Sequence, residues 1–119
     1  MTAAAEAILR YFRQPPRRTP DDLGIVFGSE GAEYFAPAAD LLEITPALPV
    51  SPLPGSPHGV AFWRGKAYEV RGNAAGAVNF ILVGGGPAPF FAVSETRPRA
   101  VSRTEAPGPA DYREAHGRR

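Results

Sequence analysis

Short apolar runs separated by glycine and proline fill the middle of the chain. Each run has the length of a β-strand and is too short for a helix with a buried face. Residues 78–83 form the strongest run, and its continuity from Phe80 to Val83 indicates a strand buried on both faces. Glycine-rich turns bound the other runs, as in hairpins. The pattern predicts strands at residues 24–27, 33–36, 60–63, 67–70, 78–83, 89–93 and 100–102.

The N-terminal segment has the spacing of a helix, and residues 38–42 suit a single helical turn after Pro37. Apolar residues recur in the N-terminal segment at four-residue intervals, Ile8 and Phe12 among them, which predicts a helix over residues 2–14 that ends before Pro15. Its apolar stripe would either pack on its own domain or dock on a partner. We expect it to cover the strands at residues 80–83 and 90–91, either within one molecule or across a dimer.

Prolines and charges divide the chain into parts. The segment 46–57 is rich in proline, so it is expected to run extended around the domain rather than in the middle of a sheet. We therefore assign residues 1–22 to an N-terminal helix and linker, residues 23–103 to the folded domain, and residues 104–119 to a disordered tail. So many short strands predict an all-β fold with one or two small barrels.

Composition narrows the class of protein. With 13 basic and 12 acidic residues the net charge is +1, so no strong overall field favours nucleic acid or an anionic membrane. The chain has no cysteine, which excludes disulfides and thiolate chemistry. No apolar run reaches the roughly 20 residues that span a bilayer. Glu6 and Arg10 interrupt the N-terminal apolar stretch, which argues against a signal peptide. We therefore expect a cytoplasmic protein.

Candidate catalytic and metal-binding motifs have simpler explanations. Gly84-Gly85-Gly86 leads into Pro87 and a strand, whereas a phosphate loop leads into a helix. The two histidines, His58 and His116, lie in a loop and a tail and do not make a zinc site. We therefore expect no catalytic residue, no metal, no cofactor and no small-molecule substrate.

Nucleic-acid binding is the alternative that the residues leave open. Small β-barrels that bind nucleic acid combine exposed aromatic rings with basic side chains, and residues 62–71 contain both. Simple alternation places Phe62, Arg64 and Tyr68 on one face and Trp63 on the other, which weakens this reading.

The sequence around Arg64-Gly65 has two readings. Gly65 would supply the positive φ of a tight hairpin, with Arg64 as a solvated turn residue. In the second reading the pair belongs to a longer pattern. That pattern is Leu41-Leu42-Glu43-Ile44, then Leu53-Pro54-Gly55-Ser56-Pro57, then Gly59-Val60 and Arg64-Gly65.

This order resembles the CheW-like coupling domain of bacterial chemosensory systems, with its V-x-E-I, V-P-G-A-P, G-V and R-G segments. The first hairpin, residues 24–36, and the strands at residues 80–94 are similar to the family as well. There are departures: the V-D-x-V aspartate is Ser94, and the chain lacks the family's later strands. The likeness is to a short, divergent form, similar to the second coupling protein of the myxobacterial Frizzy system.

The resemblance implies an all-β fold of small SH3-like barrels with a truncated second barrel. It implies a non-enzymatic adaptor that binds the cytoplasmic domain of a methyl-accepting chemoreceptor and binds the histidine kinase weakly or not at all. Another CheW-like protein and a homodimer are further partners that it allows. The implied partner-binding residues are Leu41, Glu43, Val60, Phe62, Arg64 and Gly65.

Overall fold

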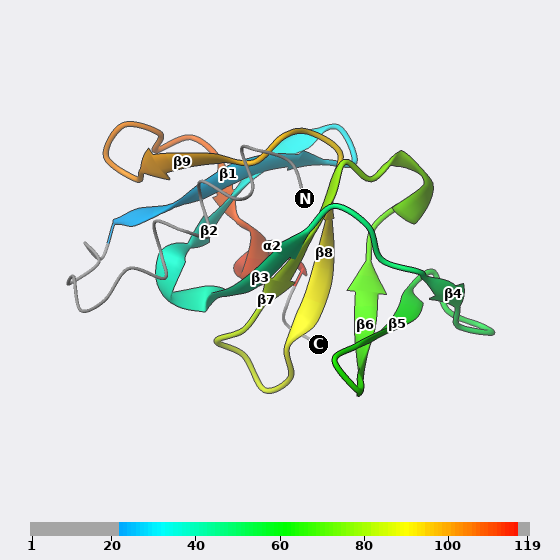
Figure 1. Cartoon of the computed structure of the whole chain (residues 1–119). Helices are drawn as coiled ribbons and strands as arrows, with labels where there is room; N and C mark the ends of the chain where they lie inside the picture. Colours follow the sequence, from blue (N-terminus) through cyan, green and yellow to red (C-terminus); the bar gives the residue numbers. More distant parts are fainter. Residues whose placement is uncertain (1–21, 117–119) are drawn as a thin grey trace.

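The computed structural model describes residues 22–116. They form a mostly β protein with two mixed sheets, of four strands in the order β10-β2-β1-β9 and of six strands in the order β3-β7-β8-β6-β5-β4 (Figure 1). The predicted all-β class is therefore confirmed. The strands are β1 (Leu23–Ser29), β2 (Ala32–Pro37), β3 (Leu41–Thr45), β4 (Ser51–Pro52), β5 (Gly59–Trp63), β6 (Lys66–Arg71), β7 (Asn79–Val83), β8 (Phe90–Ser94), β9 (Arg99–Ser102) and β10 (Ala110–Asp111). The helices are the 3-10 turns η1 (Ala38–Asp40) and η2 (Ala74–Gly76) and the α-helix α2 (Tyr112–His116).

Both predicted hairpins are present. β1 pairs with β2 up to Ser29 and Ala32, and β5 pairs with β6 up to Trp63 and Lys66. Each turn therefore has two central residues, and in both turns these residues have positive φ. This is the backbone of a type I′ turn, whose twist matches that of the strands it joins.

The central strands β7 and β8 are buried on both faces, as the continuous apolar run predicts. On one face their side chains join a core with β1, β2 and β3, which includes Ile25, Phe27 and Ile44. On the other face they join a second core with β5, β6 and the proline-rich segment, which includes Ala61 and Leu48. In Figure 1, β1 and β9 lie above β7 and β8, and β5 and β6 lie to one side.

The proline-rich segment runs along the edge of the larger sheet. Its only strand is β4, which pairs with Val60 and Gly59 of β5 and has no other strand partner in the part of the chain that is described. Proline has no backbone N–H and cannot donate a hydrogen bond to a neighbouring strand. An edge position, with a strand on one side only, therefore suits this proline-rich segment. The prediction that the segment avoids the middle of the sheet is confirmed. The predicted extended path is interrupted by a turn, in which Ser56 N–H donates to the carbonyl oxygen of Leu53 and Leu53 N–H donates to that of His58.

The barrel prediction is confirmed only at the coarser level of a β fold. The two sheets curve around the two cores, but within residues 22–116 their ladders do not close into a barrel. Among the same residues, no helix has the length and apolar character needed to cross a membrane.

The prediction of a disordered tail is wrong for residues 104–116. β10 pairs in parallel with β2, and α2 follows it at once. Tyr112 is only 2% exposed in the first core. Polar composition suggested disorder because no periodicity is visible there. A single aromatic side chain that finds a preformed apolar site is enough to hold the segment, and a composition argument does not detect it.

The predicted N-terminal helix lies outside the described residues. Its expected role was to cover residues 80–83 and 90–91. Those residues are at most 5% exposed, and described residues of both cores pack against them. The predicted cover by the helix involves residues outside the described range and stays a prediction.

Asn79 is the polar residue that fits this core least well. It is fully buried at the start of β7, and neither its Oδ1 nor its Nδ2 has a hydrogen-bond partner. Burial of an unsatisfied amide costs about 1–3 kcal/mol. We expect Asn79→Val to raise the free energy of unfolding by about 1 kcal/mol, because valine removes the unsatisfied groups and favours a strand. Chemical denaturation checks this, with Asn79→Asp, which buries a charge, as the destabilised control. A loss of stability in Asn79→Val would contradict the prediction.

Candidate protein-interaction site

A β-bulge in β3 brings two consecutive side chains to one surface. Leu41 pairs with Val83 and Glu43 pairs with Leu82, so Leu42 is the extra residue between them. A bulge bends its strand and redirects side chains, and bulges are frequent beside functional sites. Leu42 is 51% exposed, whereas Glu43 is only 4% exposed. Both line the same shallow hollow.

The β5–β6 hairpin supplies the other side of this hollow through an unusual turn. Arg64 has φ 51° and Gly65 has φ 82°. Glycine is favoured at such positions, and asparagine is the usual residue at the first one. Arginine in this conformation costs about 1–2 kcal/mol. Non-glycine residues held in this way are concentrated at functional positions, which makes Arg64 a candidate.

Arg64 reaches across to Glu43. Its Nη2 lies 3.4 Å from Glu43 Oε2, with the Arg64 side chain 73% exposed and the Glu43 side chain 6% exposed. Because solvent screens the arginine, the pair contributes no more than about 1 kcal/mol to stability. The guanidinium carbon also lies 5.4 Å from the centre of the Trp63 ring. The ion pair therefore serves mainly to orient the exposed guanidinium of Arg64 and contributes little to the stability of the fold.

The resulting hairpin hollow has a volume of about 270 Å³. Two rings stiffen its wall: Trp63 and Tyr68 both pack edge-on against Phe91, with centroids 6.2 and 5.5 Å away. The residues that line the hairpin hollow are Leu42, Glu43, Trp63, Arg64, Lys66, Tyr68 and Leu82.

The register of the hairpin corrects the predicted faces. Directly paired residues share a face, and Trp63 pairs with Lys66 while Ala61 pairs with Tyr68. Trp63 and Tyr68 are thus on the same face, and Phe62, which pairs with Ala67, is on the other. Simple alternation failed because it was continued through the turn, where the chain reverses.

The predicted site residues are therefore divided. Glu43 and Arg64 meet at the hairpin hollow, whereas Gly65 follows Arg64 in the turn and is not part of the lining. Leu41 instead packs against the first core. Val60 and Phe62 lie on the outer face of β5, where Phe62 is 73% exposed. The sequence reasoning missed five residues, although pairing the strands across a two-residue turn would have found most of them: Leu42, Trp63, Lys66, Tyr68 and Leu82.

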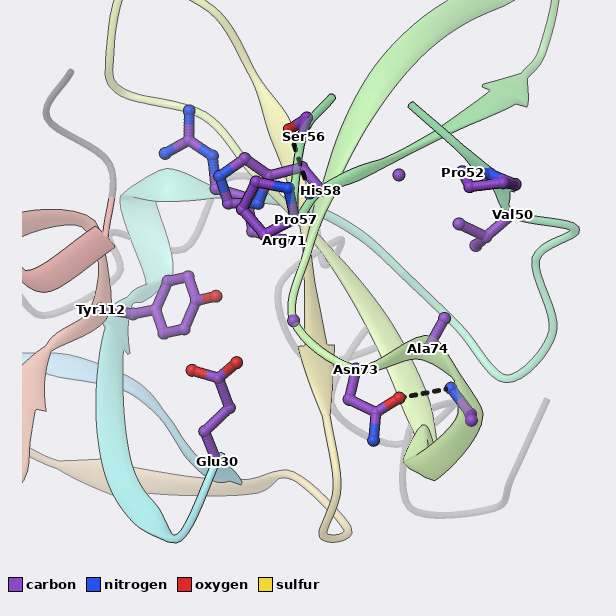
Figure 2. Close-up of a pocket in the computed structure, with 13 residues that line it drawn as sticks. Glu30, Val50, Pro52, Ser56, Pro57, His58, Arg71, Asn73, Ala74 and Tyr112 are labelled. Carbon is purple, nitrogen blue, oxygen red and sulfur yellow. Dashed lines mark hydrogen bonds between the residues drawn. The ribbon is translucent and has the colours of Figure 1, made fainter. Parts of the chain in front are cut away.

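A second and larger hollow of about 640 Å³ lies between the β1–β2 turn, the loop before β5, the end of β6 and α2 (Figure 2). Its polar lining includes Glu30, His58, Arg71, Asn73 and Tyr112. Across residues 22–116, no three or more histidine, aspartate or glutamate side chains are grouped as they would be around a metal ion.

The chain matches no protein-family model, and no curated protein is significantly similar to it. The fold and the hairpin hollow define a mostly β protein with a charged and aromatic surface site.

Proposed function

We propose that the chain is a non-enzymatic adaptor of a bacterial chemosensory array, a divergent CheW-like coupling protein of the cytoplasm. It binds the cytoplasmic domain of a methyl-accepting chemoreceptor through the hairpin hollow. One observation carries the proposal: the ion pair between Glu43 and Arg64. These residues come from two separate segments of the resemblance, the V-x-E-I and R-G segments, and they meet at one surface.

The hairpin hollow has the properties of a contact site for a protein. Arg64 presents an exposed guanidinium, which donates charge-assisted hydrogen bonds to a carboxylate or a carbonyl oxygen. Leu42 supplies exposed apolar surface beside it. Trp63 and Tyr68 are held by their packing on Phe91, so little side-chain entropy is lost on binding. Arginine and aromatic residues are also the types that most often dominate binding energy.

The direct test is a titration of the full chain with a chemoreceptor cytoplasmic fragment, followed by calorimetry. We expect saturable binding that depends on Arg64. Absence of binding to receptor fragments from the source organism would contradict the proposal.

Binding to the kinase is expected to be much weaker. The family contacts the kinase through a further barrel, and residues 104–116 of this chain instead fold back on β2 as β10 and α2. We expect the isolated regulatory domain of the histidine kinase to bind at least about tenfold more weakly than the receptor fragment, a difference of about 1.4 kcal/mol. Parallel titrations check this, and equally tight binding of the kinase domain would contradict it.

Nucleic-acid binding is a second candidate, favoured by the corrected register. Trp63, Arg64, Lys66 and Tyr68 all line one hollow, which is the combination that single-strand binders use. The negative charge of Glu43, which also lines this hollow, opposes a phosphate backbone. Retention on heparin or single-stranded DNA that falls steeply with salt would favour this candidate over the adaptor.

A further inference from the structure

The larger hollow has the size of a site for a small ligand. Its volume of about 640 Å³ lies within the range of roughly 300–1,000 Å³ typical of such sites. It is assembled from parts of the chain that are distant in sequence, as Figure 2 shows, with Glu30 and Tyr112 on one side and Asn73 and Ala74 on the other. Apolar lining comes from Val50, Pro52 and the alanines of η2.

Glu30 gives the hollow a negative group in a costly conformation. It is the first central residue of the β1–β2 turn, with φ 53°, where asparagine or glycine is usual. Its backbone N–H donates to Glu95 Oε1 at 3.0 Å, which helps to hold the turn. The Glu30 carboxylate points into the hollow beside the ring of Tyr112 (Figure 2). An acidic side chain kept at a strained position and directed into a cavity indicates a role in binding.

Arg71 and Asn73 give the hollow donors in defined positions. The Arg71 side chain is only 13% exposed, its Nε lies 2.5 Å from Glu69 Oε1, and its guanidinium carbon lies 4.1 Å from the centre of the Phe90 ring. Asn73 Oδ1 accepts a hydrogen bond from the backbone N–H of Ala75 at 3.1 Å. That bond fixes the amide, so its Nδ2 is the donor that a ligand would use.

These opposite charges select the kind of ligand. An ion of one sign would be attracted by one of the two groups, Glu30 and Arg71, and repelled by the other. A molecule with both charges is attracted by both. We propose that this hollow binds a small zwitterion, a free amino acid or a dipeptide, with its ammonium group at Glu30 and its carboxylate at Arg71 and Asn73. The apolar lining favours small side chains such as alanine. This site is separate from the hairpin hollow and does not depend on the proposed adaptor function.

The test uses L-alanyl-L-alanine and its two blocked forms, the N-acetyl dipeptide and the dipeptide amide, titrated into the full chain and followed by NMR chemical shifts. Each blocked form lacks one charge. We expect the free dipeptide to bind about tenfold more tightly than either blocked form, with shifts centred on residues 71–75.

Variants of Glu30 test recognition of the ammonium group separately from recognition of the carboxylate. Glu30→Gln should bind the free and the acetylated dipeptide equally, because the variant has no carboxylate to attract the ammonium group of the free dipeptide. It should still bind the free dipeptide more tightly than the dipeptide amide, because Arg71 is unchanged. Glu33→Gln, on the same hairpin but outside the larger hollow, should behave as the unaltered chain. If Glu30→Gln is poorly folded by its melting temperature, Glu30→Asn replaces it, because asparagine accepts positive φ. Failure of the dipeptide to saturate, equal affinity for all three compounds, or an unchanged preference in the Glu30 variants would each overturn the proposal.

Discussion

Replacement of Tyr112 by alanine is expected to lower the free energy of unfolding by about 3–5 kcal/mol. The side chain is 2% exposed and its ring lies 5.1 Å from those of Phe27 and Tyr34 and 6.0 Å from that of Phe90, measured between centroids. Alanine would leave a cavity among these rings. It would also release β10, whose pairing with β2 covers only two residue pairs. Denaturant unfolding checks the magnitude, and loss of amide protection in residues 110–116 checks the mechanism.

Tyr112→Phe is the matched control, because it keeps the ring and should lose no more than about 1 kcal/mol. If Tyr112→Ala were as stable as the unaltered chain, the tail would not be part of the core.

The hydroxyl group of Tyr112 gives a second check through pH. Burial, with a smaller contribution from the Glu30 carboxylate, raises the pKa of Tyr112 far above its ordinary value of 10.0. The unfolded chain therefore loses this proton above about pH 10 while the folded chain keeps it, so stability falls as the pH rises beyond that value. Tyr112→Phe should show a smaller loss over the same alkaline range.

Arg113 attaches the same segment to η1 and to the β7–β8 turn. Its Nε lies 3.6 Å from Asp40 Oδ2, and its Nη1 donates a hydrogen bond to the carbonyl oxygen of Gly85. Burial raises the pKa of Asp40 above its ordinary value, and the Arg113 charge opposes that rise. The ion pair thus compensates in part for placing a carboxylate against the core, but the Tyr112 ring accounts for most of the attachment.

Replacement of Arg64 by asparagine is expected to weaken binding of the receptor fragment by about 1–3 kcal/mol without loss of stability. The exposed guanidinium is the donor of the hairpin hollow, so its removal costs binding energy. Asparagine accepts the positive φ of this position better than arginine or alanine does, so the turn itself is retained or improved. Calorimetric titration measures the affinity, and thermal unfolding confirms that the fold is intact.

Two controls identify the face that binds. Arg99→Asn removes an arginine that is 54% exposed and lies away from the hairpin hollow, and it should leave the affinity unchanged. Phe62→Ala removes the exposed ring on the outer face of β5. If Phe62→Ala abolished receptor binding while Arg64→Asn did not, the outer face would be the site and the hairpin hollow would not.

Local sequence patterns were sufficient to predict those parts of the structure that depend on residues close together in the chain. Alternation and turn residues predicted both hairpins, and the apolar run at Phe80–Val83 predicted a strand covered on both sides. The pair Arg64-Gly65 marked the turn that carries the site. These features follow from backbone conformation and side-chain period, which a short stretch of sequence determines by itself.

Tertiary structure decided what depends on distant partners. The bulge at Leu42 appears only when β3 is paired with β7, and it brings Leu42 rather than Leu41 to the hairpin hollow. Trp63 shares a face with Tyr68 only once the register of the turn is known. Tyr112 folds the tail because Phe27, Tyr34 and Phe90, from three other strands, already surround its position. These contacts join residues that are far apart in the chain, so their contribution to stability cannot be read from a local sequence pattern.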